Sequence, residues 1–415
     1  MPQVFNKKIV AAGAIGNVLE WYDFAVYGYF ATSIGRVFFP KEDPIAQVLF
    51  AFGVFAIGFL MRPLGGIVIG NIGDRIGRKQ ALSVSVAAMA IATFIVGILP
   101  GYDAIGLAAP ILLTICRMLQ GLSVGGEYTT SIVFMVENAP PNRRGIAAAL
   151  AGCGSVIGIL LGSATGTALA ALMPPEILDS WGWRIPFLLG LVIGVVGLLL
   201  RRNIEAKNEV TVEQKQPIIE TIECYRPLLA RLAGLSVFNA VTFYLIFVYL
   251  VSWLQLEDKM GQEVSLEINT ISMIIVIPVM IAAGVLSDRI GRKPLLIGTV
   301  IAAIFFAYPL FNGMHHSSQV IVQLCQLGFA VLIGIYLGSS PALMVETAPA
   351  HIRTTSVALG FNLSLGIVGG LTPLTATWLV NQTHSAIAPA FMIIAAALIS
   401  LVALLFMKET YKQNL

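Results

Sequence analysis

The sequence predicts an all-α, polytopic membrane protein with twelve transmembrane helices in two six-helix halves. Of its 415 residues, 57% are apolar and only 11% are charged, whereas soluble domains carry about 25% charge. So few charges cannot cover the surface of a soluble globule, and the mean hydropathy of +0.86 supports the same conclusion. The apolar residues also fall into stretches of about 20 residues, the length that crosses a bilayer as a helix. A motif repeated half a chain length apart predicts the two halves.

The spans are delimited by charged and proline-rich interruptions. The first apolar stretch begins after eight residues and contains no small-residue cleavage site, so it is expected to be a retained span rather than a signal peptide. Segment 188–200 is apolar on every face, which favours helices over strands of alternating polarity. The predicted spans are 9–35, 45–70, 80–100, 104–136, 145–173, 183–201, 226–256, 267–287, 295–314, 319–346, 352–380 and 385–407.

Basic residues alternate between the two sides of this topology. One set of loops and ends holds 19 of the 25 Lys and Arg residues, and the opposite set holds only Arg36, Lys41, Arg184 and Lys259. Because cytoplasmic loops carry the excess of basic residues, both termini are expected in the cytoplasm. The four cysteines lie far apart without a CxxC pair, so we expect neither a disulfide framework nor a metal site. No basic patch with interleaved aromatics suggests nucleic acid, and we expect a monomer without a cofactor.

Two sequence echoes define the halves. Residues 70–79 (GNIGDRIGRK) recur as 284–293 (GVLSDRIGRK), and the pair Glu137 and Arg144 recurs as Glu346 and Arg353. The predicted N-terminal half is 1–201, the C-terminal half is 226–415, and the polar segment 202–225 is the predicted cytoplasmic linker between them. Repeated halves around a midplane site are typical of alternating-access carriers.

The repeated loop motif resembles that of the major facilitator superfamily. Further segments are similar to its metabolite:proton symporter family, and above all to the proline/betaine transporters of bacteria: Gly16–Phe24, Arg62–Gly66, Arg117–Tyr128, Trp181–Phe187, 361–364 and 407–410. The resemblance covers nearly the whole chain. It implies the major facilitator fold and proton-coupled symport of a small zwitterion in the bacterial inner membrane. No heptads follow the last span, so the osmotic gating of coiled-coil relatives is not expected.

Ionisable residues inside spans are candidates for the proton pathway, because an unpaired charge in a membrane is costly. They are Glu20 and Asp23 in the first span, Arg62 in the second, and Arg117 and Glu127 in the fourth. Carriers of the resembled superfamily commonly pair a first-span acid with a fourth-span arginine. We therefore expect Asp23 to pair with Arg117 and to release it on protonation, with Glu127 and Glu20 as further proton-coupling candidates. The alternative is a static ion pair that only holds two helices together.

The repeated loops are expected to form a cytoplasmic gate. In the resembled superfamily the motif aspartate caps a neighbouring helix and the arginine bridges to an acid. We expect Glu137 with Arg144, and Glu346 with Arg353, to extend these contacts, the alternative being solvated loop charge. The predicted gate residues are Asp74, Arg75, Arg78, Asp288, Arg289, Arg292, Glu137, Arg144, Glu346 and Arg353.

The expected solute is a zwitterion, because a polycarboxylate would need several free cations in the cavity. Its carboxylate would bind Arg117, and its nitrogen would be held by aromatic rings through cation–π attraction. Many of the aromatics could instead face lipid. The predicted binding residues are Arg117, Tyr27, Trp21, Asn239, Thr242, Tyr244 and Asn362. The alternative substrate is an organic acid such as 2-oxoglutarate, citrate or shikimate.

Three further patterns concern packing. Glycines recur every four residues from Gly154 to Gly166, which predicts close helix contact. Gln319, Gln323 and Gln326 form a polar stripe that is either wet or bonded to another helix. The cluster 366–373 contains three glycines and Pro373, and is expected to interrupt the eleventh span. An intramembrane enzyme or a channel would not require the symmetric loop motifs, and no catalytic spacing is present.

Overall fold

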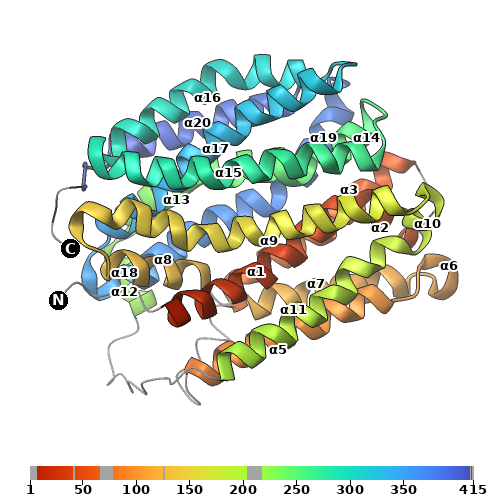
Figure 1. Ribbon diagram of the computed structural model, residues 1–415, viewed down its shortest axis with the longest axis horizontal. Coiled ribbons are helices and arrows are strands. Elements are labelled where there is room, and N and C mark those ends of the chain that lie inside the picture. The colour runs from red at the N-terminus through yellow and green to blue at the C-terminus, as the bar shows by residue number, and fades with distance from the viewer. Residues whose placement is uncertain are drawn as a thin grey trace.

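The structure is a computed structural model that describes residues 7–40, 43–65, 78–124, 127–202, 217–411 and 413. All regular elements in these segments are helices, and none is a strand. The helices run lengthwise beside one another (Figure 1). Those of the N-terminal half are α1 Lys7–Tyr29, α2 Ala31–Phe38, α3 Pro44–Leu60, α5 Arg78–Ile98, α6 Tyr102–Ile105, α7 Ala108–Ser123, α8 Glu127–Glu137, α9 Arg144–Leu172, α10 Pro175–Ser180 and α11 Ile185–Arg202.

The described residues of the C-terminal half are helical as well and include two π-helical segments. Its elements are α12 Pro217–Cys224, α13 Arg226–Tyr244, η3 Leu245–Tyr249, α14 Leu250–Leu256, α15 Gln262–Ile290, α16 Arg292–Met314, α17 Gln319–Thr347, α18 Arg353–Asn362, η5 Leu363–Gly369, α19 Gly370–Thr383 and α20 Pro389–Leu405. Helix α12 lies in the predicted linker 202–225, and the rest of that linker, 203–216, lies outside the described residues.

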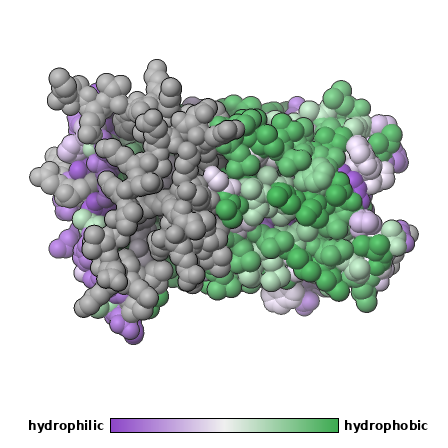
Figure 2. All heavy atoms as spheres, turned by 90° about the horizontal axis from the view of Figure 1, so that it is seen from below, coloured by the Kyte–Doolittle hydropathy of each residue, from purple (hydrophilic) through white to green (hydrophobic). Residues whose placement is uncertain are grey.

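The helices match the predicted spans. Eight helical stretches are long and apolar enough to cross a membrane, one of them, Ala108–Glu137, including two residues outside the described segments. The shorter apolar helices Ser83–Ile98, Gly182–Val196 and Pro389–Leu405 coincide with spans three, six and twelve. Helix α1 occupies the first span. Hydrophobic side chains form a broad zone on the face in Figure 2, with hydrophilic residues toward both ends. This distribution is that of a protein whose middle faces lipid.

The two halves pack through helices that lie side by side along their lengths. Helix α9 packs against α15, and α3 packs against α19. Glycines on α9 allow close approach to α1, because a Cβ added at Gly158 would lie 2.5 Å from the Val18 carbonyl oxygen. Nearer the C-terminal end of α9, a Cβ added at Gly166 would lie 3.2 Å from Leu266 Cδ1 of α15. The predicted packing role of the glycine stripe is therefore confirmed for these positions.

The polar stripe of α17 bonds to α15 rather than to lipid. Gln323 Nε2 donates to Ser272 Oγ at 2.9 Å, and Gln326 Nε2 donates to Asn269 Oδ1 at 3.1 Å. Gln319 is exposed at the beginning of the helix. Two of the three glutamines therefore have the interhelical role that the sequence left open.

The glycine cluster of the eleventh span produces a π-helical segment, η5, and the helix then continues through Pro373 in α19. The expected interruption is therefore a bulge within a continuous span. A second π-helical segment, η3, follows Tyr244 in the seventh span and has no glycine or proline to predict it. Such bulges are frequent at functional sites, and Tyr244 packs against Gly369 at the end of η5.

Candidate functional site

A buried ion pair joins α1 to α7 inside the N-terminal half. Arg117 Nη1 lies 2.7 Å from Asp23 Oδ2, and both side chains are fully buried. The expected contact between these two residues is present. Since neither charge reaches solvent, the pair must be stabilised by its own attraction and by further hydrogen bonds.

Neutral donors from two helices complete the carboxylate's contacts. Thr93 Oγ1 of α5 donates to Asp23 Oδ1 at 2.7 Å, and Gln120 Nε2 of α7 donates to the same oxygen at 2.8 Å. Gln120 Oε1 in turn accepts a 2.8 Å bond from Arg117 Nη1. The four side chains thus form one closed network, in which a change of charge on Asp23 alters every bond.

The guanidinium of Arg117 is otherwise enclosed by rings. Its Cζ lies 4.2 Å from the Tyr27 ring centroid and 5.0 Å from that of Phe24. Its Nε and Nη2 atoms have no hydrogen-bond partner among the described residues. Tyr27 is itself anchored, because its hydroxyl donates to the Ala51 carbonyl oxygen at 2.9 Å. The aromatic enclosure offers cation–π attraction but no alternative anion for Arg117.

A second buried ion pair, which the sequence did not predict as a pair, lies beside the first. Arg62 Nη2 donates to Glu20 Oε1 at 2.6 Å, and the side chains are 3% and 7% exposed. Glu20 was expected to help carry the proton, and Arg62 was noted only as an intramembrane charge. The signal that could have joined them is that each is an ionisable residue within a span and needs an opposite charge nearby. The side chain of Glu127 lies outside the described residues.

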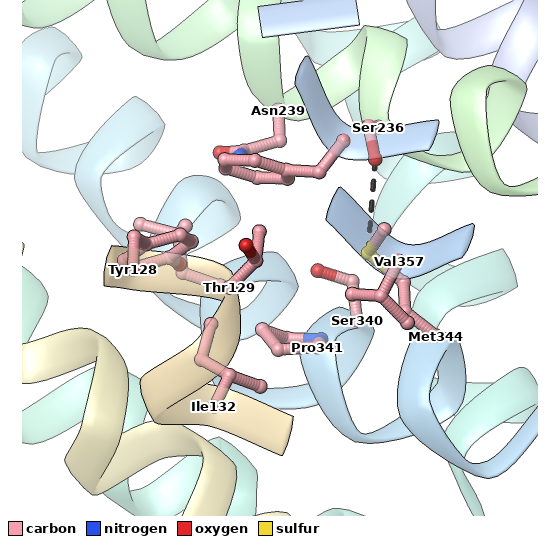
Figure 3. A pocket seen from close by; sticks show the side chains of 11 residues that line it. Tyr128, Thr129, Ile132, Ser236, Asn239, Ser340, Pro341, Met344 and Val357 are labelled. Atoms are coloured by element: carbon pink, nitrogen blue, oxygen red, sulfur yellow. Dashed lines mark hydrogen bonds between the residues drawn. The ribbon is translucent and has the colours of Figure 1, made fainter. Parts of the chain in front are cut away.

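A small cavity lies between the two halves (Figure 3). Its volume is about 10 Å³, roughly the space of one water molecule. Tyr128, Thr129 and Ile132 of α8 line one side, and residues of α13, α17 and α18 line the other. The cavity is therefore built by both halves, but it is too small in this conformation to hold an organic solute.

Of the predicted solute contacts, only Asn239 lines this cavity. Arg117 and Tyr27 lie inside the N-terminal half, and Asn362 is half-buried. Several members of the predicted set nevertheless have polar atoms that are buried without a hydrogen-bond partner among the described residues: Trp21 Nε1, Asn239 Oδ1, Thr242 Oγ1 and Tyr244 Oη. Such atoms are rare in folded proteins and suggest groups that await a partner.

One copy of the loop motif caps a helix of the opposite half. The carboxylate of Asp288, at the end of α15, accepts bonds from the backbone N–H groups of Gly145 at 2.8 Å and Ile146 at 3.0 Å. These are the second and third residues of α9, whose free N–H groups need acceptors. Arg292 lies 2.7 Å from Asp288 and 3.1 Å from Glu346, which fixes the capping carboxylate. We call this part of the bundle the latch end.

The acids of the second echo do not pair as expected. Glu137 binds Arg353 of the opposite half at 2.6 Å, instead of Arg144. Glu346 binds Arg292 and accepts a bond from Thr410, instead of pairing with Arg353, while Arg144 donates to the carbonyl oxygen of Gln413. The predicted pairings are wrong because the packing of the halves sets these acids against bases from other segments.

The remaining gate residues are less informative. Arg289 is exposed, so it lies outside this buried cluster. Asp74 and Arg75 lie outside the described residues, and so does the side chain of Arg78 at the first turn of α5. No cluster of His, Cys, Asp and Glu able to hold a metal ion occurs in the part of the chain that the structure describes.

Comparison with known proteins identifies one family. The model of the Major Facilitator Superfamily matches residues 14–373 and 262–415. The chain is 36% identical to the glycine betaine/proline/ectoine/pipecolic acid transporter OusA of Dickeya dadantii, covering 99% of this chain and 84% of that protein. It is 35% identical to the proline/betaine transporter of Escherichia coli K12, covering 99% and 85%.

A third relative and a solved structure agree with this result. A putative proline/betaine transporter of Staphylococcus aureus is 37% identical over 97% of this chain and 88% of its own length. The fold matches the crystal structure of a D-xylose-proton symporter with a TM-score of 0.79 at 19% identity, over 99% of this chain and all of the other. Together with the helices described above, this match supports the predicted twelve-helix fold.

The cap at the latch end predicts a stability effect. Replacing Asp288 with Ala should lower the free energy of unfolding by about 1–3 kcal/mol, because two N–H groups of α9 lose their acceptor. The measurement is the thermal unfolding midpoint of the purified protein in detergent. Arg289→Ala is the matched control, since this neighbouring side chain is exposed and should leave the midpoint nearly unchanged. Equal midpoints for Asp288→Ala and the wild type would contradict the capping role.

Proposed function

This chain belongs to the major facilitator superfamily, and from that membership we propose that it moves a small zwitterion across the membrane together with a proton. Members of the family are transporters, not enzymes. The observation that carries the coupling proposal is the fully buried pair of Asp23 and Arg117, which lies within membrane-spanning helices. Intramembrane charges of this kind typically mark ion and proton pathways.

The proton would act by exchanging the partners of Arg117. Protonating Asp23 removes the only carboxylate that bonds to Arg117 among the described side chains, and leaves Gln120 and the rings. A buried guanidinium without its counter-charge is strongly destabilised. The N-terminal half must then rearrange until Arg117 finds another anion or water, and this rearrangement links the proton to the movement of the halves.

The transport cycle would alternate between opening the two ends of the bundle. At the latch end, the halves are joined by the Asp288 cap and by Glu137 with Arg353. At the opposite end, Ser163 bonds to Thr270 across the halves at 2.7 Å, and Thr32 donates to Gln255 at 2.9 Å. Since both ends are bonded in this way, we assign this conformation to an occluded intermediate, in which the cavity between the halves has a volume of about 10 Å³.

The orientation is also part of the proposal. The latch end would face the cytoplasm with both termini, because that side carries the excess of Lys and Arg. The protein would be a multi-pass monomer of the bacterial inner membrane. Residues 1–201 and 226–415 would move as the two rocking halves around the segment 202–225.

A zwitterion is the substrate class that these charges suit best. Arg62 and Arg117, the described arginines inside the spans of the N-terminal half, already have an acid partner, so a di- or tricarboxylate would find too few free cations. A zwitterion adds no net charge to the site. The relatives named above are transporters of proline and betaine by their names, and the same solutes are the first candidates here.

The proposal is tested by uptake into proteoliposomes that contain the purified protein. An inwardly directed proton gradient should drive accumulation of proline or glycine betaine, and an uncoupler that collapses the gradient should abolish it. Liposomes without protein, and 2-oxoglutarate as an anionic solute, are the controls. Accumulation of 2-oxoglutarate in place of both zwitterions would reject the proposed substrate class.

Replacing Asp23 with Asn should separate proton coupling from solute exchange. Asn keeps the size and can still accept hydrogen bonds from Thr93 and Gln120, but it does not titrate. We expect proton-driven accumulation to fall at least about tenfold, as for loss of a charged hydrogen-bond partner, while counterflow between preloaded and external solute persists. If the variant still accumulates solute with a proton gradient as the wild type does, Asp23 is not the coupling residue.

A further inference from the structure

The second ion pair lies near the boundary with the C-terminal half. Arg62 Cζ is 5.2 Å from the ring centroid of Phe59 and 5.8 Å from that of Trp21. Phe59 packs at 5.2 Å against Tyr244, and Trp21 packs at 6.1 Å against Phe243, both of α13. A single layer of rings therefore separates Glu20 and Arg62 from the C-terminal half.

The same rings connect this pair to the cavity. The Trp21 ring lies 5.9 Å from that of Tyr128, which lines the cavity and packs at 5.0 Å against Phe361 on its other side. Widening the cavity toward α1 would bring a solute directly onto Trp21 and the ion pair behind it. Arg117 is also one ring away from the C-terminal half, because Phe55, 5.9 Å from its Cζ, packs at 6.0 Å against Tyr244. The rings that enclose Arg117, however, do not line the cavity.

Arg62 also keeps unused binding capacity. Its side chain is 3% exposed, yet only Nη2 is bonded to Glu20, and the Nε and Nη1 atoms have no partner among the described residues. The neighbouring Trp21 Nε1 and Tyr244 hydroxyl are buried and unpartnered as well. Both edges of a guanidinium that can bind a carboxylate through two bonds include Nη2, so releasing Nη2 from Glu20 would complete such an edge with Nε or Nη1.

We propose that Arg62 binds the carboxylate of the zwitterionic solute when the halves part, and that Glu20 with the rings of Trp21 and Phe243 holds its ammonium group. This inference rests on the proposed function and replaces Arg117 as the carboxylate-binding residue. The ion pair between Glu20 and Arg62 is then the arrangement of the site before the solute binds. Each charge of the pair exchanges its partner for the opposite charge of the solute, so no buried charge is left unpaired.

This assignment gives the two arginines different roles. Arg117 would respond to the proton through Asp23, inside the N-terminal half, whereas Arg62 would respond to the solute at the boundary of the halves. The solute then needs a carboxylate and a cationic nitrogen at once. A quaternary ammonium compound without a carboxylate would gain only the cation–π attraction of the rings.

The test compares two ligands that differ in the carboxylate. Glycine betaine and choline are titrated by calorimetry into the full-length protein in nanodiscs, without a proton gradient. The double variant Glu20→Gln/Arg62→Gln removes both charges together and so leaves no uncompensated charge. Its Kd for betaine should rise about tenfold to hundredfold, the effect of losing hydrogen bonds to a charged group, while its Kd for choline should change less than about twofold.

Two variants make the result decisive. Arg36→Gln is the control. The Arg36 side chain is 54% exposed and pairs with Asp179 at the end of the bundle opposite the latch end, so this variant should preserve the betaine Kd. Arg62→Lys keeps the charge without the two-pronged geometry and should bind betaine more weakly than the wild type. Wild-type betaine affinity in the double variant, or equal losses for betaine and choline, would show that the pair only holds α1 to the turn that follows α3.

Failure of the proposed function gives a different pattern. If the wild type binds neither betaine nor proline and accumulates neither, the zwitterion proposal fails and this assignment fails with it. If the wild type accumulates betaine with a proton gradient but the double variant retains its affinity, only the assignment of Arg62 is overturned. Thermal unfolding midpoints of all variants identify any loss caused by misfolding, and Arg62→Lys then decides the outcome.

Discussion

The need to pair every charge inside the membrane governs this structure. Four of the ionisable side chains in the first, second and fourth spans form two ion pairs, each between different helices, and the pairs lie close together in one half. Buried charges are tolerated inside the membrane only while the partners of each pair stay in contact. A proton or a zwitterion that enters the site must therefore displace one partner and supply another. This requirement makes buried charges suitable both for coupling and for recognition.

A similar requirement closes the latch end, where backbone N–H groups need a hydrogen-bond acceptor. Helix α9 begins without a local side-chain cap, and its first N–H groups bond to Asp288 of the other half. Opening the latch end would expose these N–H groups to water, which can satisfy them at a modest cost. The latch is thus strong enough to hold one conformation and weak enough to be released. At the opposite end, bonds between neutral side chains such as Ser163 and Thr270 have the corresponding role.

The sequence predicted the helices, the pairing of Asp23 with Arg117 and the polar stripe of glutamines, because hydropathy, motif position and helical spacing are local signals. It left open whether the stripe is wet or bonded to another helix. It did not predict that Glu137 binds Arg353, because local spacing favours Arg144, and only the packing of the halves sets the two loops against each other. The pair of Glu20 and Arg62 depends on the rotation of α1 against α3, which no spacing within one segment encodes. The π-helical η3 has no glycine or proline signal, whereas η5 was indicated by its glycines.

The central claim is that the Asp23 carboxylate takes up the coupled proton. Infrared difference spectroscopy of the reconstituted protein reports this directly, since a protonated carboxyl group has a carbonyl band that a carboxylate lacks. We expect this band to appear on acidification, to change when glycine betaine is added, and to be missing in Asp23→Asn. An unchanged band in Asp23→Asn would place the proton on another residue and contradict the account.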